Sequence, residues 1–405
     1  MKGVSLKGLI DFLKVKVPEI DWTVTPIWLK ATAGLRMLPT SESRAILDSI
    51  KDYLLNKTNS PFLFRPSWAT IIPGNEEGGF GWIAYNYLMK IIGPKKNMLS
   101  KNTPYAVVEM GGASAQVSQV APNEEEAEKI PKEYRFSFTI EDETFHLYTH
   151  SYLGYGAEQA REKLNEYLVE TKSFHTTTAT TTTATAVASN GTDSSSSLLQ
   201  DPCINTGYSR PTSTPPSDYY HGPNHHGIIG TAAATTTTST AQCTSVLESI
   251  IKKKKNKCDA INEPTSIECI HQPRFVTDSP NFLVFENFFY VSSGIGVKPL
   301  QGNITTFPLI TTPDQIKQSS IEVCGYDYNT LQASYPKDKQ SKEVNIKLCF
   351  LSSYAYNFLV DGLKVSKEKV ITIQKEVGSS EIEWALGAAY KEAADLLKRT
   401  NLRPT

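Results

Sequence analysis

The sequence predicts a mixed α/β fold, and three observations carry that prediction. Strand-like and helix-like segments alternate along the chain on both sides of one low-complexity tract, as in proteins whose helices pack on a central sheet. The composition is that of an ordinary globular protein, with 40% apolar and 20% charged residues. A length of 405 residues is enough for two or three domains with their own cores.

The expected elements follow in order along the chain. Segments 25–32 and 67–74 have the apolar runs of buried strands, and segment 42–57 has the spacing of an amphipathic helix. A turn of Gly and Glu residues should then lead into a helix at 81–92. The remaining pattern predicts a hairpin at 105–120, strands at 134–140 and 144–153, a helix at 156–170 and a closing helix from about 380.

Residues 173–242 differ from the rest because they consist largely of Thr, Ser and Pro tracts. Such tracts bury too little apolar surface to offset chain entropy, so most of this segment is predicted to be a disordered insertion. One short piece, DPCINTGY at 201–208, is expected to be anchored. The nearby histidines lack a carboxylate or thiol partner, which favours solvent exposure over metal binding for His221, His225 and His226.

The charge balance argues against a nucleic-acid partner. The formal net charge is −1, and the one basic run, KKKKNK at 252–257, is interpreted as a solvated helix end. No apolar run reaches the roughly 18 to 20 residues of a membrane span. Residues 1–20 lack the apolar core of a signal peptide.

Cysteines and glycosylation sequons favour the secretory route. The six cysteines are even in number and contain no CxxC pair, which suits disulfides of undetermined connectivity. Sequons lie at Asn56, Asn190 and Asn303. We therefore expect the lumen of the secretory pathway (ER or Golgi) or the extracellular space, if an export signal lies upstream of Met1.

The first candidate site is VVEMGGASAQV at 107–117, where valines predict a strand on each side of a turn. Glycines remove the Cβ atoms that would keep a ligand away, so consecutive N–H groups can point at an anion. Ser114 adds a hydroxyl donor, Gln116 can orient a water from the same strand face, and Glu109 can hold a hydrated divalent cation. The alternative is a plain hairpin with a Gly turn. The predicted phosphate loop is Gly111, Gly112, Ala113 and Ser114.

Two further segments place polar residues at predicted strand ends. Glu76 and Glu77 follow the strand 67–74, where a carboxylate held between two rigid elements can act as a general base. The alternative is that both cap the following helix. Thr32 and Arg36 follow the strand 25–32; Thr32 could donate to a phosphate or position a water, and Arg36 could balance carboxylates.

Four segments together resemble the apyrase motifs of the nucleoside triphosphate diphosphohydrolase family. They are KATAGLRML, GNEEGGFGWIAYNYL, EMGGASAQ and EWALGAAY, in the family's order and at compatible spacing. LYTHSYLGYG resembles the segment after the third motif, and the cysteines fall where luminal and extracellular members carry theirs. The resemblance covers about residues 8 to 395 apart from the Thr-rich insertion.

The resemblance implies an actin-like (ribonuclease H-like) fold of two α/β lobes with a nucleotide between them. The N-terminal lobe would comprise 1–73 and about 388–405, and the C-terminal lobe 74–387 interrupted by 173–242. It also implies that the chain hydrolyses the terminal phosphate of nucleoside tri- or diphosphates with Ca²⁺ or Mg²⁺. In-line attack by water needs positioning and charge stabilisation, and no covalent intermediate.

The resemblance also assigns roles to residues by their places in the motifs. Glu77 is the implied general base, Ser114 and Gln116 help to hold the attacking water, and Thr32 lines the same site. The loop 111–114 binds phosphate, and Glu109 holds the metal through water.

Two aromatic residues complete the implied site. Phe289, in ENFFYV, falls where members stack a ring on the base, and a place in the core is the alternative. Trp384 is expected to pack behind the cleft.

The chain departs from the family pattern in two ways. Members begin with a further hairpin of the type DAGSSHT, which nothing here resembles, so we expect an incomplete N-terminal lobe and interpret the chain as a shortened gene model or clone. Glu109 and Ala115 replace the usual Asp and Thr, which predicts an altered cation preference or a reduced turnover. The alternative function is a catalytically inactive nucleotide-binding or scaffold protein.

Overall fold

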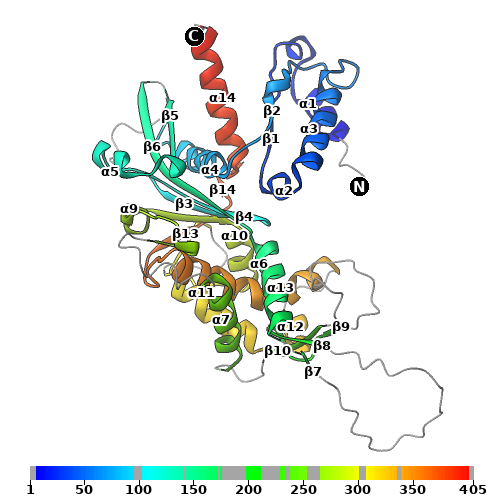
Figure 1. Ribbon diagram of the computed structural model, residues 1–405, viewed down its shortest axis with the longest axis vertical. Coiled ribbons are helices and arrows are strands. Elements are labelled where there is room, and N and C mark those ends of the chain that lie inside the picture. Colours follow the sequence, from blue (N-terminus) through cyan, green and yellow to red (C-terminus); the bar gives the residue numbers. More distant parts are fainter. Residues whose placement is uncertain are drawn as a thin grey trace, which may run out of the picture.

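The structure is a computed structural model that describes residues 6–94, 103–140, 142–171, 174–175, 198–210, 228–232, 238–252, 265–300, 307–334 and 339–400. Its largest sheet has seven strands (Figure 1). In spatial order they are β12 (Leu309–Thr311), β13 (Ile371–Ile373), β11 (Phe282–Glu286), β3 (Ala106–Met110), β4 (Ser114–Val120), β6 (Glu143–Leu153) and β5 (Arg135–Ile140).

The topology of this sheet is that of a ribonuclease H-like lobe. β3, β4 and β6 form an antiparallel meander, and β11 and β13 extend the sheet parallel to β3. The antiparallel strands β5 and β12 form its two edges. Parallel neighbours require crossover connections, which the helices supply. The predicted mixed α/β fold is confirmed.

The helices cover both faces of the sheet (Figure 1). On one face lie α4 (Gly74–Leu88) and α14 (Trp384–Thr400). On the other lie α6 (Ala157–Glu170), α7 (Thr238–Ile251), α10 (Asn287–Gly294), α11 (Pro313–Gly325) and α13 (Lys339–Asn357). Shorter helices are α5 (Glu124–Lys129), α9 (Arg274–Asp278) and α12 (Tyr328–Ser334).

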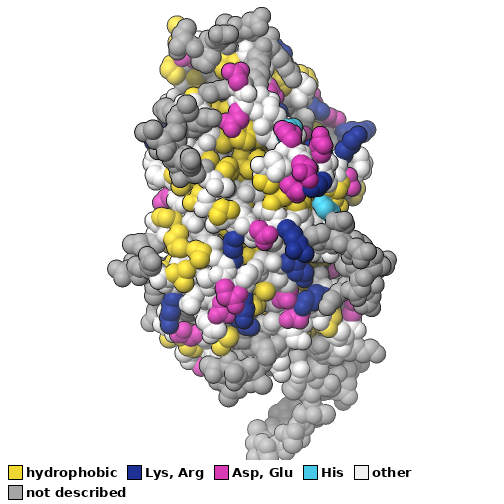
Figure 2. Space-filling model, turned by 90° about the vertical axis from the view of Figure 1, so that its left-hand side faces the viewer, with side chains coloured by type: hydrophobic (Ala, Val, Ile, Leu, Met, Phe, Trp, Pro, Cys, Tyr) yellow, Lys and Arg dark blue, Asp and Glu magenta, His cyan; other side chains and the backbone are white. Residues whose placement is uncertain are grey.

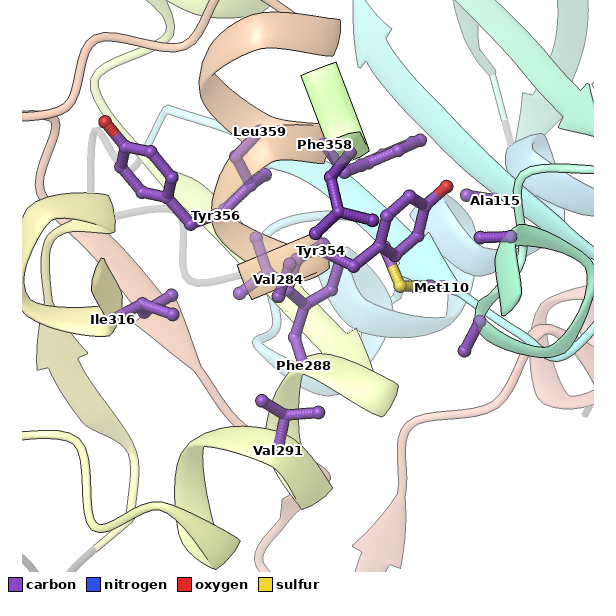
Figure 3. Packing of buried hydrophobic residues seen from close by; sticks show 14 of the residues in the cluster. Met110, Ala115, Val284, Phe288, Val291, Ile316, Tyr354, Tyr356, Phe358 and Leu359 are labelled. Carbon is purple, nitrogen blue, oxygen red and sulfur yellow. The ribbon is translucent and has the colours of Figure 1, made fainter. Parts of the chain in front are cut away.

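Alternate residues of the central strand β3 face two different cores, as the period of a strand requires. Val107 packs with Phe80 and Trp82 of α4. Val108 and Met110 belong to the larger cluster on the opposite face. Figure 3 shows part of that cluster, in which side chains of the sheet, of α10, α11 and α13 and of the segment after α13 lie together. Those labelled are Met110, Ala115, Val284, Phe288, Val291, Ile316, Tyr354, Tyr356, Phe358 and Leu359.

A separate group of elements precedes α4. It contains α1 (Lys7–Lys16), α2 (Ala33–Arg36), α3 (Thr40–Leu55) and a parallel pair of strands, β1 (Leu29–Ala31) and β2 (Ala69–Ile71). Its core, which includes Ile10, Leu54 and Phe62, shares no buried residue with the two cores of the large sheet. Lys30 of β1 forms an ion pair of 2.6 Å with Glu392 of α14. The proposed lobe boundary at 73/74 falls between β2 and α4.

The start of α4 corrects the sequence prediction. The predicted turn and helix at 81–92 become one helix that begins at Gly74, so Glu77 lies in the helix and not in a turn. A Cβ atom on Gly74 would lie 2.2 Å from Ser151 Cβ, and one on Gly78 would lie 2.5 Å from Thr149 Oγ1. Glycine is a poor helix former, but here it lets the helix contact β6 closely. Tertiary packing therefore overrides the local propensity.

The predicted insertion contains more structure than the expected piece at 201–208. A small sheet in the order β7-β8-β10-β9 comprises β7 (Phe174–His175), β8 (Leu198–Asn205), β10 (Ile228–Ala232) and β9 (Ser209–Arg210). Helix α7 begins at Thr238, inside the predicted limits. Most of the Thr-rich runs, His221, His225, His226 and the basic run from residue 253 lie outside the described residues.

Two disulfides whose cysteines both lie in the described part of the chain crosslink this half of the molecule. Cys203 of β8 bonds Cys243 of α7, and Cys324 of α11 bonds Cys349 of α13. The bonds close sequence separations of 40 and 25 residues, which restricts the unfolded chain. The predicted use of cysteines in disulfides is confirmed for these pairs.

The surface carries charges of both signs. On the face in Figure 2, Lys and Arg side chains are interspersed with Asp and Glu, and hydrophobic side chains lie between them. The absence of a nucleic-acid partner stays a prediction. Among the described residues, no helix combines the length and apolar character needed to cross a membrane.

Two short strands, β14 (Glu376–Val377) and β15 (Ser380–Glu381), form a hairpin before α14.

Candidate active site

In the turn between β3 and β4 the backbone carbonyls are engaged in hydrogen bonds, whereas two backbone amides are not. The Gly111 carbonyl accepts from Ala157 N at 2.9 Å, the Gly112 carbonyl accepts from Glu158 N at 2.9 Å, and the Ala113 carbonyl accepts from Gly154 N at 2.8 Å. The amides of Gly112 and Ala113 have no acceptor within the described part of the chain. Two adjacent N–H groups in a tight turn form an anion-binding feature.

The N-terminus of α6 holds this turn in place. Its cap residue is Gly156, where a Cβ atom would lie 2.5 Å from the Gly112 carbonyl and from Ser114 N. Only glycine leaves room for the turn to lie against the helix. The sequence fragment YGAEQ therefore positions the loop, a role that the sequence analysis did not assign.

Glu77 lies in a buried position with one cationic partner. It is 5% exposed, and its Oε2 accepts a hydrogen bond of 2.7 Å from Arg36. Burial raises the pKa of Glu77 above its ordinary value, and the Arg36 guanidinium acts in the opposite direction. A carboxylate with a raised pKa in a cleft is suited to general-base chemistry.

Glu77 and the phosphate loop line one pocket, of about 440 Å³. This juxtaposition is what the sequence hypothesis requires of residues 77 and 111–114. The remaining walls come from the start of α2, the ends of β3 and β11 and the start of α14. The full lining is Thr32, Ala33, Gly34, Glu77, Glu109, Gly111, Gly112, Ala113, Ser114, Glu286, Glu383, Trp384 and Ala385.

Glu109 is the most strongly perturbed acid in this pocket. It is 6% exposed, and its Oε2 has no hydrogen-bond partner in the described part of the chain. Its pKa is raised well above the ordinary value, chiefly by burial and further by the charges of Glu77, Glu286 and Glu383. An unpaired buried carboxyl oxygen is costly, and a cation would satisfy it.

The residues fit a hydrated divalent cation. Carboxylate oxygens are the ligands that Ca²⁺ and Mg²⁺ prefer, and the pocket has four glutamates near one guanidinium. The described residues contain no group of three or more acidic, His or Cys side chains that could hold a metal directly. Mg²⁺ commonly binds through one or two carboxylates, waters and substrate phosphate, which matches a water-mediated role for Glu109.

Of the other predicted water-site residues, two line the pocket and one lies behind its wall. Thr32 and Ser114 line the pocket. Gln116 is 2% exposed and lies behind Ser114, to whose Oγ it donates a hydrogen bond of 2.6 Å. Gln116 is not among the lining residues, and it contacts one of them, Ser114.

The structure favours the core alternative for Phe289. Its ring is 9% exposed and lies 4.4 Å from that of Phe307. Its neighbour Tyr290 is 60% exposed, and base stacking requires an accessible ring. Trp384 lines the pocket at the start of α14, and it also packs against the core on the α4 side of the sheet.

Sequence reasoning missed Glu286 and Glu383 as pocket residues. Glu286 ends β11, which is parallel to β3, so both strands end at the same edge of the sheet. That edge is the usual position of ligand sites in such sheets. The signal was available, because Glu286 immediately precedes NFFYV and Glu383 begins EWALGAAY.

Fold and site together define a class: an actin-like α/β protein in which a glycine turn and a buried carboxylate line one pocket. The chain belongs to the GDA1/CD39 (nucleoside phosphatase) family, whose sequence profile matches residues 2–404. This confirms the family resemblance seen in the motifs.

Individual relatives agree with this assignment. The chain is 28% identical to "Probable apyrase 6" of Arabidopsis thaliana over 398 residues, which are 97% of this chain and 62% of that protein. It is 27% identical to the guanosine-diphosphatase of Schizosaccharomyces pombe over 401 residues, 96% of this chain and 64% of that protein. The chain thus spans less than two thirds of the length of these relatives.

A solved structure supports the fold alone. The nucleoside triphosphate hydrolase structure from Neospora caninum superposes with a TM-score of 0.60 at 14% identity, and the match covers 97% of this chain and 77% of that chain.

Proposed function

We propose that this chain hydrolyses the terminal phosphate of nucleoside di- or triphosphates with a base-activated water. The observation that carries the proposal is that the Glu77 carboxylate and the amides of Gly112 and Ala113 belong to one pocket. Family membership supports it, as do the apyrase and guanosine-diphosphatase names of the relatives.

The residues divide the work in a way that follows from their chemistry. The free amides and the Ser114 hydroxyl hold the terminal phosphate and stabilise charge on its equatorial oxygens. Glu77 accepts a proton from the attacking water, and Thr32, which lines the same pocket, helps to place that water. General-base catalysis of this kind is worth about 10²–10⁴-fold in rate.

We further propose Ca²⁺ or Mg²⁺ as the cofactor, held through water by Glu109. When bound, the cation neutralises phosphate charge that would otherwise be repelled by Glu77, Glu109, Glu286 and Glu383. The family depends on divalent cations, and the unpaired Oε2 of Glu109 supports this position.

We place the protein in the secretory lumen or outside the cell. The disulfides Cys203–Cys243 and Cys324–Cys349 suit an oxidising compartment. The sequon residue Asn56 is exposed at the end of α3 and accessible to modification.

The test is release of inorganic phosphate from GDP, UDP, ADP, ATP and AMP by the purified chain, with Ca²⁺, Mg²⁺ or EDTA. We expect cation-dependent release from di- or triphosphates and none from AMP. Calorimetric binding of a non-hydrolysable nucleotide without any release would favour the alternative, a nucleotide-binding protein without turnover. If the chain neither releases phosphate nor binds the nucleotide, both functions are rejected.

Replacing Glu109 by Gln should stabilise the cation-free protein at neutral pH, because glutamine keeps the size of the side chain and removes a buried carboxyl whose charged form is disfavoured by burial and by Glu77, Glu286 and Glu383. Since the folded pKa of Glu109 is raised, wild-type stability should fall as pH rises from 4.5 through the folded value. Glutamine cannot ionise, so its advantage should grow over the same range. Thermal unfolding against pH measures this.

The same variant should lose the thermal shift that Ca²⁺ or Mg²⁺ gives the wild type. Glu124→Gln, at a position that is 80% exposed in α5, is the matched control and should change neither quantity. A Glu109→Gln protein that is less stable than the wild type at neutral pH and still responds to the cation would contradict this account of Glu109.

A further inference from the structure

A hydrogen-bond network connects the proposed base to the phosphate loop behind the pocket wall. The Nη2 atom of Arg36 lies 2.7 Å from Glu77 Oε2, 3.4 Å from Ser151 Oγ and 3.5 Å from Ser114 Oγ. Gln116 Nε2 donates to Ser114 Oγ at 2.6 Å and to Ser151 Oγ at 2.9 Å. Arg36 and Ser151 do not line the pocket.

We propose that Arg36 and Ser151 are positioning residues that fix the relative orientation of Glu77 and Ser114 for attack by water. The proposal rests on the proposed hydrolytic function. Neither residue touches the substrate; each acts through Glu77, Ser114 or Gln116.

The count of donors and acceptors gives Ser114 a defined direction. A hydroxyl has two acceptor sites and one donor. The oxygen of Ser114 accepts from Gln116 Nε2 at 2.6 Å, and an amide –NH2 group only donates, so the serine hydrogen is left to donate elsewhere. Ser114 lines the pocket, so this hydrogen can donate to a phosphate oxygen or to the oxygen of the attacking water. A water that accepts from Ser114 keeps both of its own hydrogens, and one of them can be donated to the Glu77 carboxylate in the same pocket.

Ser151 also accepts from Gln116, and it is the second nearest acceptor of Arg36 Nη2 after Glu77. Ser151 thus joins strand β6 to helix α2 through the guanidinium. Gly74 lies directly against it, because a Cβ atom there would be 2.2 Å from Ser151 Cβ. The start of α4, which carries Glu77, is thus packed onto the residue that orients Gln116.

Arg36 is itself held by a second contact. Its Nη1 donates to the Ile72 carbonyl at 3.0 Å, so the planar guanidinium is anchored at the end of β2 while Nη2 faces Glu77. Lysine has no such fork. The charged groups around Glu77 are Arg36 from α2, Glu109 from β3, and Glu286 and Glu383, which line the same pocket. Arg36 is the cation among them.

The test compares kcat and KM for Arg36→Ala, Arg36→Lys and Ser151→Ala. Misplacing a reacting group by about 1 Å costs about 100-fold in rate, so we expect kcat of Arg36→Ala to fall about that much with little change in KM. Ser151→Ala should lose about 10-fold, since one of two acceptors of Gln116 remains. Arg36→Lys should stay well below wild type, and free guanidinium, but not urea, should partly restore Arg36→Ala.

Ser118→Ala is the matched control. Ser118 is 1% exposed and bonds Thr149 Oγ1 at 2.7 Å, two cross-strand pairs further along β4 and β6 than Gln116 and Ser151. It should lower stability as much as Ser151→Ala and leave kcat unchanged. Thermal unfolding shows that each variant is folded.

The outcomes separate this inference from the proposed function. Turnover that requires Glu77 but is unchanged in Arg36→Ala and Ser151→Ala would overturn the positioning role alone. Equal losses of kcat in Ser151→Ala and Ser118→Ala would also overturn it, because a general loss of packing would then explain both. Absence of any phosphate release by the wild type would overturn the proposed function and this inference with it.

Discussion

Glu77→Gln should lower kcat for phosphate release by about 10²–10⁴-fold, the range for removal of a general base. Glutamine keeps the shape of the side chain and a hydrogen-bond acceptor for Arg36, so KM should change little. The raised pKa of Glu77 places the acid limb of the wild-type pH–rate profile above pH 4.5, since the base must be ionised. Steady-state rates against pH measure both effects.

The matched control for this experiment is Glu76→Gln. Glu76 precedes Glu77 in α4 and does not line the pocket. It should retain wild-type kcat and the same pH profile. A Glu77→Gln protein that turns over like Glu76→Gln would remove Glu77 as the base.

Gly387→Ala should be among the most destabilising single substitutions in the chain. A Cβ atom at this position of α14 would lie 1.9 Å from the Phe80 carbonyl oxygen and 3.0 Å from Ala84 N, both backbone atoms of α4. Backbone cannot rotate away, so the two helices must separate. Overpacking costs about 1–3 kcal/mol and occasionally more, and chemical denaturation should show a loss at or above the top of that range.

The control for this substitution is Gly8→Ala. Gly8 lies within α1, and a Cβ atom there would meet nothing within 4 Å. Alanine favours helix over glycine by about 1 kcal/mol, so this variant should be neutral or more stable. Equal stability of the Gly387→Ala protein and the wild type would show that α4 and α14 leave room for a Cβ atom at this position.

The hairpin at 105–120 could be predicted from sequence because its pattern is local. Every residue of β3 is buried, and the valines on both sides of the glycines mark two strands without reference to the rest of the chain. The start of α4 could not be predicted in this way. Its glycines favour a turn locally, and the helix depends on Ser151 and Thr149, which are more than 70 residues away in sequence.

The same distinction applies to the site. Glu77, Thr32 and the loop 111–114 could be predicted as site residues from the motifs, because each motif is a short contiguous pattern. Glu286 and Glu383 were missed because their approach to Glu109 depends on the pairing of β11 with β3 and on the position of the segment before α14. For Phe289 and Tyr290, the orientation of α10 about its own axis decides which ring is buried, and this orientation could not be predicted from the sequence.

The turn at 111–114 has a consequence for which ligands the pocket accepts. Because α6 and Gly154 already engage its carbonyl oxygens, a peptide flip that turned a carbonyl toward the ligand would break bonds on the opposite side. The main chain of the turn can therefore donate hydrogen bonds to a ligand but cannot accept hydrogen bonds from one. The main chain of this turn offers no acceptor to an ammonium group or a sugar hydroxyl. Its selectivity for an oxyanion is therefore present before a ligand binds.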